Sequence, residues 1–344
     1  MSSLRLVFFG TPDFAVPTLE RLIAGPHDVV GVVSQPDRVR GRGRRESPSP
    51  VSAVALREGI PLVRPEHIAD AEVVETLRAL RADLGIVVAF GQFLSRKIRE
   101  MPDCGYLINA HASLLPKYRG ASPIAQAILE GESETGVSVM RIEREMDAGP
   151  VGCVVRTRIE PRENTAELSV RLSEIAATAI EQIVLGIARG DIQWAPQDAN
   201  LVTLAPKLEK SDAVLDLREG ARALTCRIHA LSPKPGGELT LVSETHDASG
   251  NPSNETILKL LRADVIPFDV TNMSVTGTLN PAPGTIERNI DGAALHIATG
   301  DGWLVPLVMQ RAGGKALPIA DFLRGFELGN DARCALPDLD LETP

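Results

Sequence analysis

The sequence of 344 residues predicts an α/β protein in which a doubly wound, mostly parallel sheet is followed by a small β-barrel. The first part of the chain contains short, continuous apolar runs rich in β-branched residues, as strands buried on both faces require. Stretches with helical hydrophobic spacing separate these runs, and such alternation is typical of a parallel sheet. After residue 208 the pattern changes to short strands broken by Gly and Pro, which favours a barrel.

In the first part, three segments are expected as buried strands, at 6–9, 29–33 and 86–90. Helices are expected over 16–23 and 73–80, because the hydrophobic residues there fall on one helical face. A longer helical pattern covers 166–190. The ligand crevice of such a sheet lies beyond the carboxyl ends of its strands.

The second part predicts five short strands, at 239–242, 257–261, 284–286, 295–298 and 303–307. The polar stretches 243–256 and 267–283 are expected to be long surface loops. We therefore divide the chain into an α/β domain at 1–190, a linker at 191–207, a β-barrel at 208–336 and a short acidic tail at 337–344.

Composition argues against several classes of function. A formal charge of −9 disfavours non-specific adhesion to nucleic acid or anionic membranes. An aromatic content of 3% disfavours a platform on which single-stranded bases stack. No apolar run approaches the roughly 18–20 residues of a membrane span. The apolar run at the start of the sequence is too short for a signal peptide. The four cysteines lie far apart, so we expect reduced thiols in a cytoplasmic protein rather than disulfides or structural zinc.

Common nucleotide-binding and hydrolase signatures are missing from the sequence. The turn after the first strand, 10–14, reads Gly-Thr-Pro-Asp-Phe and lacks the Gly-x-Gly-x-x-Gly fingerprint of dinucleotide-binding proteins. The phosphate-binding loop of ATPases, the His-Glu-x-x-His of zincins and the Gly-x-Ser-x-Gly of α/β-hydrolases do not occur either. These enzyme classes therefore lose their main support.

The densest group of polar candidates is Asn109, His111 and, 36 residues later, Asp147. Asn109 and His111 are two apart at the end of an apolar run, so they project from one face of a strand. An amide, an imidazole and a carboxylate can stabilise an oxyanion, move a proton and orient the proton carrier. Spacing alone also fits structural polar residues. No third ligand lies at suitable spacing, so we expect no metal.

Five arginines occur within eight residues of an otherwise acidic chain: Arg38, Arg40, Arg42, Arg44 and Arg45. On charge alone, this segment fits a solvated loop. Arginine also suits contacts with RNA, because its guanidinium binds phosphate in a bidentate way and stacks on unpaired bases.

Several of these segments resemble a known family. Residues 109–120, which begin Asn-Ala-His-Ala-Ser-Leu-Leu-Pro and end Arg-Gly, are similar to the signature of folate-dependent formyltransferases. Within that superfamily, 10–17, 35–38, 41–51 and 298–302 resemble the methionyl-tRNA formyltransferases. The resemblance extends from about residue 4 to 330, and it is strongest over the first 150 residues.

The resemblance implies a Rossmann-like formyltransferase domain in which Asn109, His111 and Asp147 are catalytic and no metal takes part. The free amine of initiator methionyl-tRNA would attack the formyl carbon of 10-formyltetrahydrofolate, giving N-formylmethionyl-tRNA for translation initiation. The folate would lie against Phe90, Gly91, Ser113, Leu114, Leu115 and Pro116.

The resemblance also implies how the protein meets its partners. The five arginines would enter the acceptor arm of the tRNA. The C-terminal barrel, which in this family resembles an OB fold, would hold the inside of that arm. A cytoplasmic monomer without a membrane partner is expected.

Some features depart from the family pattern. The family's Pro-Trp-Pro reads Pro233-Lys234-Pro235 here, which removes an aromatic contact, whereas the changes at Phe90 and Ala148 leave the chemistry intact. Residues 207–344 contain 13 Lys and Arg against 19 Asp and Glu, which is unfavourable for a polyanion unless the basic groups cluster. The alternatives are an amino-sugar-nucleotide N-formyltransferase with the same donor, a formyl-folate hydrolase and a non-catalytic tRNA-binding factor.

Overall fold

The computed structural model divides the chain into two compact units, each built from several segments. It describes residues 3–40, 45–242, 255–268, 280–288, 293–326, 328–329 and 332–337. One unit comprises Met1–Pro123, Glu134–Arg158 and Leu168–Pro206, and the other comprises Ile124–Ser133, Ile159–Glu167 and Lys207–Pro344.

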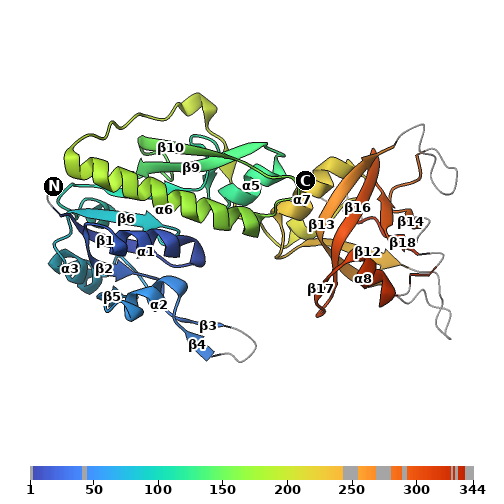
Figure 1. The fold of residues 1–344 in the computed structure, drawn as a ribbon, viewed down its shortest axis with the longest axis horizontal. Helices are drawn as coiled ribbons and strands as arrows, with labels where there is room; N and C mark the ends of the chain where they lie inside the picture. Colours follow the sequence, from blue (N-terminus) through green and yellow to red (C-terminus); the bar gives the residue numbers. More distant parts are fainter. Residues whose placement is uncertain are drawn as a thin grey trace, which may run out of the picture. The chain divides into compact units, whose positions relative to one another are not determined.

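The first unit is organised around a seven-stranded sheet with the order β10-β9-β7-β6-β1-β2-β5 (Figure 1). Five strands are parallel: β1 (Arg5–Gly10), β2 (Asp28–Val33), β5 (Leu62–Val63), β6 (Leu84–Val88) and β7 (Leu107–His111). Two antiparallel strands, β9 (Glu134–Arg141) and β10 (Val151–Arg158), extend the sheet beyond β7. The prediction of a mostly parallel sheet is therefore confirmed.

The path of the chain through this sheet reverses direction once. It leads from β1 outward through β2 to β5, returns to β6 beside β1, and continues to β7 on the other side. Right-handed crossovers therefore place α1 and α2 on one face of the sheet and α3 and α4 on the other. Doubly wound sheets bind ligands where the direction reverses, which here is at the carboxyl ends of β1 and β6.

The helices of the first unit are α1 (Val16–Ala24), α2 (Pro50–Arg57), α3 (Ala71–Ala79), α4 (Arg96–Arg99) and, from Leu168 onward, α6 (Thr165–Arg189). All of α5 (Pro123–Leu129) except Pro123 belongs to the second unit. On the α3 face, Val7 and Phe9 of β1 share a buried core with Val74 and Leu77. An ion pair of 3.3 Å between Arg21 of α1 and Glu181 places α1 beside α6. Figure 1 shows α6 running across the sheet, as the long helical pattern predicted.

Short elements complete the N-terminal part. They are η1 (Asp13–Ala15), η2 (Ala199–Leu201), the hairpin of β3 (Arg38–Arg40) and β4 (Arg45–Ser47), and the parallel pair of β8 (Arg119–Gly120) and β11 (Leu204–Ala205). The pair of β8 and β11 means that the expected linker segment packs on the first unit, where it contributes to the site described below.

The C-terminal sheet is antiparallel and has the order β14-β15-β16-β13-β12-β18, with β17 paired to β16. Its elements are η3 (Ser211–Ala213), α7 (Ala221–Ala230), β12 (Gly237–Val242), β13 (Thr256–Pro267), β14 (Ile286–Arg288), β15 (Leu295–Ala298), β16 (Gly302–Arg311), β17 (Ala316–Pro318), α8 (Ile319–Arg324) and β18 (Arg333–Cys334). An antiparallel bridge between Thr285 and Arg333 joins the two ends of this order. The sheet thus closes on a buried core that includes Leu224, Leu260 and Leu304, and the predicted barrel is confirmed.

Two features of the strands differ from expectation. β13 and β16 are longer than the segments predicted at 257–261 and 303–307. Charged residues interrupt the apolar pattern of β13, but Arg262 and Asp264 are tolerated there because each is paired, with Glu167 and Arg162. β9 and β10 were not predicted. Most of 243–256, 267–283 and the tail at 337–344 lies outside the described residues.

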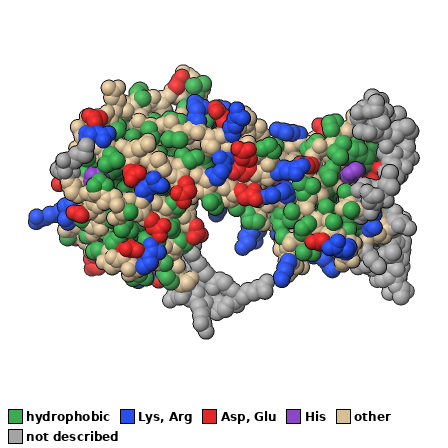
Figure 2. Space-filling view, in the orientation of Figure 1, with side chains coloured by type: hydrophobic (Ala, Val, Ile, Leu, Met, Phe, Trp, Pro, Cys, Tyr) green, Lys and Arg blue, Asp and Glu red, His purple; other side chains and the backbone are tan. Residues whose placement is uncertain are grey.

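Acidic and basic side chains are interspersed on the face of the molecule shown in Figure 2.

All four cysteines are free thiols. Among the described residues, none of the helices combines the length and the apolar character that crossing a bilayer requires.

Candidate active site

The candidate site begins at the carboxyl end of β7, where Asn109 and His111 lie on the same face of the strand. Ile108 and Ala110 point to the opposite face and are buried. Pairing with β6 on one side and β9 on the other fixes the backbone of Asn109. Within the described part of the chain, the Asn109 side chain makes no hydrogen bond. Its amide donor is therefore available to a substrate.

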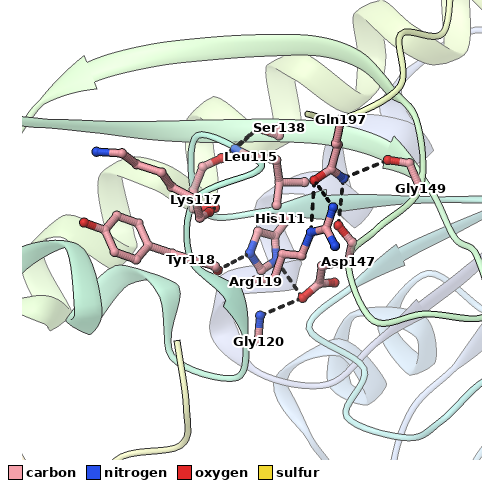
Figure 3. A network of polar contacts seen from close by, with 11 residues as sticks. His111, Leu115, Lys117, Tyr118, Arg119, Gly120, Ser138, Asp147, Gly149 and Gln197 are labelled. Carbon is pink, nitrogen blue, oxygen red and sulfur yellow. Dashed lines mark hydrogen bonds and ion pairs between the residues drawn. The ribbon is translucent and has the colours of Figure 1, made fainter. Parts of the chain in front are cut away.

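His111 is 6% exposed, and its two ring nitrogens face different partners (Figure 3). Nε2 lies 2.8 Å from the carbonyl oxygen of Tyr118. A carbonyl can only accept a hydrogen bond, so Nε2 carries the proton and donates it. Nδ1 lies 3.6 Å from Oδ2 of Asp147. Any proton that His111 shares with a substrate must therefore be at Nδ1.

A tight turn after β7 presents the Tyr118 carbonyl to His111. Ser138 of β9 fixes the start of the turn, because its hydroxyl donates to the carbonyl of Ser113 at 2.7 Å and accepts from the amide of Leu115 at 3.0 Å. The Ser113 hydroxyl donates to the Lys117 carbonyl at 2.6 Å. The turn is thus closed by its own polar groups and by one strand beneath it.

The second half of the turn is fixed from the segment that follows α6. The backbone amide of Tyr118 donates to the hydroxyl of Thr203 at 2.9 Å. The backbone amide of Arg119 donates to the carbonyl of Thr203. Gly120 has a φ of +129°, and a side chain there would meet the Ala205 carbonyl. Only glycine permits this approach of β8 to β11.

Asp147 lies in the loop between β9 and β10 with a φ of +53°. Its Oδ2 accepts a hydrogen bond of 2.9 Å from the amide of Gly120. The loop closes tightly, because a Cβ on Gly149 would lie 1.8 Å from the Arg141 carbonyl. The carboxylate therefore reaches both the His111 ring and the turn after β7.

Arg119 and Gln197 form a polar link behind the carboxylate (Figure 3). The guanidinium of Arg119 donates to Oε1 of Gln197 at 2.8 and 3.1 Å. Nε2 of Gln197 donates to the carbonyls of Asp147 at 2.7 Å and Gly149 at 2.8 Å. The 9% exposed Arg119 also lies 3.6 Å from the exposed carboxylate of Glu145.

The carboxyl ends of β1, β2 and β6 are joined beside this cluster. The Phe90 carbonyl accepts hydrogen bonds from the hydroxyl of Thr11 at 3.2 Å and from the side-chain amide of Gln35 at 2.9 Å. Gly91 has a φ of +84°, and a Cβ there would lie 2.5 Å from the Gln35 amide nitrogen. These loops line the point at which the sheet reverses direction, where the fold places a ligand.

The structure brings His111 and Asp147 together and places Asn109 two residues before His111 on the same face of β7. The other residues proposed from the sequence differ in how much of each side chain is accessible. The Phe90 ring packs on Phe9 inside the core, so only its backbone faces the loop. Ser113 and Leu115 are buried in the turn, whereas Leu114 and Pro116 are partly exposed.

The arginine segment is described only in part. Arg38 and Arg40 belong to β3, and Arg45 begins β4. Arg42 and Arg44 lie outside the described residues.

Three residues of the site were not singled out from the sequence: Gln197, Ser138 and Thr203. Gln197 and Thr203 fall in the segment read as a linker, and Ser138 falls in a strand that was not predicted. Their contacts join segments 23 to 85 positions apart, so no local pattern marks them. Among the described residues, no group of three or more His, Cys, Asp or Glu side chains is arranged to hold a metal ion.

The fold and the site place this chain in a class of enzymes. Residues 4–184 match the formyl transferase family model, and residues 207–327 match the model of the formyl transferase C-terminal domain. Both parts of the chain therefore match domains of the formyl transferases, and the chain belongs to this class of enzymes.

Relatives narrow this class. The methionyl-tRNA formyltransferase of Parvibaculum lavamentivorans is 39% identical over 94% of this chain and 98% of its own length. That of Roseiflexus sp. strain RS-1 is 39% identical over 96% of this chain and 95% of its own length. The chain belongs to the methionyl-tRNA formyltransferase family.

A solved structure shares the fold at lower identity. An N-formyltransferase from Helicobacter canadensis, in complex with folinic acid and dTDP-3-aminofucose, is 16% identical over 88% of this chain and 98% of its own, with a TM-score of 0.60. At this identity the likeness concerns the fold alone.

Proposed function

We propose that this enzyme transfers the formyl group of 10-formyltetrahydrofolate to the α-amino group of initiator methionyl-tRNA, giving N-formylmethionyl-tRNA for translation initiation. Family membership supports the reaction. One observation supports the site: His111 donates from Nε2 to a carbonyl and turns Nδ1 towards Asp147, on the strand that also carries Asn109 two residues away. The Asn109 amide, and Nδ1 of His111 when it carries a proton, are the donors that the proposal assigns to the formyl oxygen.

In the proposed reaction, the amine nitrogen forms a bond to the formyl carbon, and the bond from that carbon to the folate nitrogen breaks. Negative charge develops on the formyl oxygen between these events. The Asn109 amide and a proton on Nδ1 of His111 stabilise that charge, because both donors are held in place before the reaction. One proton leaves the amine and one arrives at the folate nitrogen, and Asp147 assists this transfer.

Asp147 has a second role in the proposal, which is to orient the His111 ring. Nε2 donates to the Tyr118 carbonyl, so Nδ1 is the ring nitrogen that faces the carboxylate, at 3.6 Å. The ring is thereby held with Nδ1 on the side of the carboxylate.

The proposed folate site is the edge formed by the loops after β6 and β7. The positive φ of Gly91 and the fixed turn at Ser113–Pro116 leave backbone groups, Leu114 and Pro116 to line it. The donor chemistry fits a formyl oxygen, since the Asn109 amide has no partner among the described residues. Phe90 contributes through its backbone, because its ring belongs to the core.

We further infer that Arg38, Arg40, Arg42, Arg44 and Arg45 contact the tRNA and that the C-terminal barrel assists. Their charge and bidentate chemistry support this assignment. A monomer acting in the cytoplasm, where initiator tRNA is used, completes the proposal.

A single-turnover assay with 10-formyltetrahydrofolate and methionyl-tRNA tests the function, with formyl-methionine detected by mass spectrometry after ester hydrolysis. We expect product with the wild-type protein. Asn109→Ala should reduce the rate by about 10²–10³-fold, the usual cost of one oxyanion donor, with little change in folate affinity. Asp147→Asn should also lose most of the rate.

Glu75→Gln is the matched control, because this exposed carboxylate of α3 pairs with Arg78 and belongs to none of the segments that build the site. It should retain the wild-type rate. Saturable folate binding without product would refute methionyl-tRNA as the acceptor and direct the assay to amino-sugar nucleotides or water.

A further inference from the structure

Gln197 holds three groups around the Asp147 loop in one fixed arrangement. Its orientation is determined by its partners, since Arg119 can only donate and the Asp147 and Gly149 carbonyls can only accept. The hydrogen bonds to the carbonyls of Asp147 and Gly149 are 2.7 and 2.8 Å long, and the shorter of the two bonds from Arg119 is 2.8 Å long. The amide therefore uses both of its Nε2 hydrogens and its oxygen.

The backbone that carries Gln197 is itself anchored to the sheet. Ala195 exchanges two backbone hydrogen bonds with Val151, of 2.8 and 3.0 Å. The neighbouring Trp194 lies under the guanidinium of Arg141, whose centre is 4.6 Å from the Trp194 ring and 3.9 Å from the Tyr106 ring. Such stacking fixes the rings and the cation between them. Gln197 thus extends from a rigid base.

The loop that Gln197 contacts has few other supports near the carboxylate. Residues 143–146, just before Asp147, are exposed. Asp147 has a positive φ, a conformation that residues with a Cβ adopt uncommonly and that contacts with the surroundings help to hold. Two hydrogen bonds to the carbonyls on either side of Ala148 are such contacts.

We propose that Gln197 is a positioning residue for formyl transfer, which fixes the backbone of Asp147 and thereby the approach of its carboxylate to Nδ1 of His111. This role rests on the proposed function. It makes the segment between α6 and β11 part of the catalytic apparatus. Gln197 itself touches neither substrate nor reacting atoms.

Two variants separate the contacts of Gln197. Gln197→Leu removes all of them. Gln197→Glu keeps an oxygen for Arg119 and the shape of the side chain, but it turns a carboxylate oxygen towards two carbonyls in place of the amide donor. Each should lower kcat by roughly 10- to 100-fold, because a displacement of about 1 Å at a catalytic group costs on that order. KM for folate and for tRNA should change less than twofold.

The decisive measurement is the same substitution in the Asp147→Asn background, followed by single-turnover kinetics. If Gln197 acts through Asp147, then Gln197→Leu should cost less than about twofold there, because residues that act as a unit are not additive. Gln126→Leu is the matched control. The Gln126 amide of α5 also donates a hydrogen bond, to the carboxylate of Glu130 at 2.8 Å, and has no part in the site or the barrel. Its kcat should equal that of the wild type.

Three results would overturn the role of Gln197: wild-type kcat in Gln197→Glu, an equal loss with and without Asp147→Asn, or a rise in KM with kcat unchanged. Failure of the proposed function is distinguishable, because it would show as absence of formyl-methionine with the unmodified protein.

Discussion

At the scale of single residues, two buried histidines are held in opposite hydrogen-bonding roles. His111 donates from Nε2 to the Tyr118 carbonyl. His229 of α7 instead accepts at Nε2 from the amide of Ala263, at 3.3 Å. Protonation of the ring leaves the first contact intact, but it removes the acceptor of the second.

The stability of the fold should therefore fall in mild acid. Burial lowers the pKa of His229 below its usual 6.5, and Arg262 lowers it further, while Asp264 and Glu167 oppose the shift. Below pH 6.5 the unfolded chain binds a proton that the native chain excludes, so the free energy of unfolding decreases as pH falls. Urea denaturation between pH 7.5 and 5.5 measures this slope.

His229→Gln keeps an acceptor for the Ala263 amide and removes the titration, so its slope should be smaller than that of the wild type. His27 and His296 also have lowered pKa values and contribute with the same sign, so part of the slope should remain. An identical slope in the two proteins would contradict the assignment to His229.

At the scale of elements, the site depends on contacts between a strand and the turns beside it. β7 supplies Asn109 and His111, and the turn after β7 supplies the carbonyl that orients His111. β9 supports that turn from below through Ser138, and β11 supports its far end. The geometry of the candidate site is thus set by neighbouring elements more than by the strand that carries it.

Ser138→Ala should destabilise the protein by about 1–3 kcal/mol, because it leaves the carbonyl of Ser113 and the amide of Leu115 without their buried partner. Ser138 is fully buried, so water does not readily replace the hydroxyl. The free energy of unfolding in urea measures the loss.

Ser95→Ala serves as the control, since the Ser95 side chain makes no capping hydrogen bond at the start of α4. Its stability should lie within about 0.5 kcal/mol of the wild type. A loss in Ser138→Ala no larger than that of Ser95→Ala would show that the turn does not depend on this hydroxyl.

At the scale of the whole molecule, charge is arranged unevenly along an acidic chain. The formal charge is −9, yet five of the 36 Lys and Arg residues lie between positions 38 and 45. The arginines of this segment would attract a phosphate backbone over a short distance, whereas the net negative charge of the whole chain would repel it. Such attraction depends strongly on salt, because bound counterions are released from the nucleic acid.

Replacing Arg40, Arg42 and Arg44 with Ala should raise the KM for tRNA and flatten its dependence on salt concentration, while folate affinity stays unchanged. Each lost phosphate contact should reduce the slope of log affinity against log salt by roughly 0.7–0.9. Kinetics between 50 and 200 mM salt test this.

The control replaces three exposed arginines elsewhere, Arg78, Arg156 and Arg189, and so removes the same charge. It should keep the wild-type slope. Equal slopes for both triple variants would indicate that the segment at 38–45 does not touch phosphate.

The sequence by itself determined the class of fold and the chemistry-bearing residues of β7. Local hydrophobic runs fix strand and helix type, and the spacing of two between Asn109 and His111 places them on one face of a strand. Continuous apolar strands such as β6 must be buried on both faces, which requires helices on either side. The change of pattern after residue 208 likewise marked the barrel.

Only the tertiary structure decided how the site is held. The hydrogen bond from His111 to Tyr118, the contacts of Ser138 and the two carbonyls held by Gln197 join segments that no local pattern connects. The strands β9 and β10 were not predicted, and 191–207 was read as a linker because it lacks periodicity. Short polar contacts between distant segments leave no periodic trace in a sequence, since their geometry exists only once the sheet has brought those segments together.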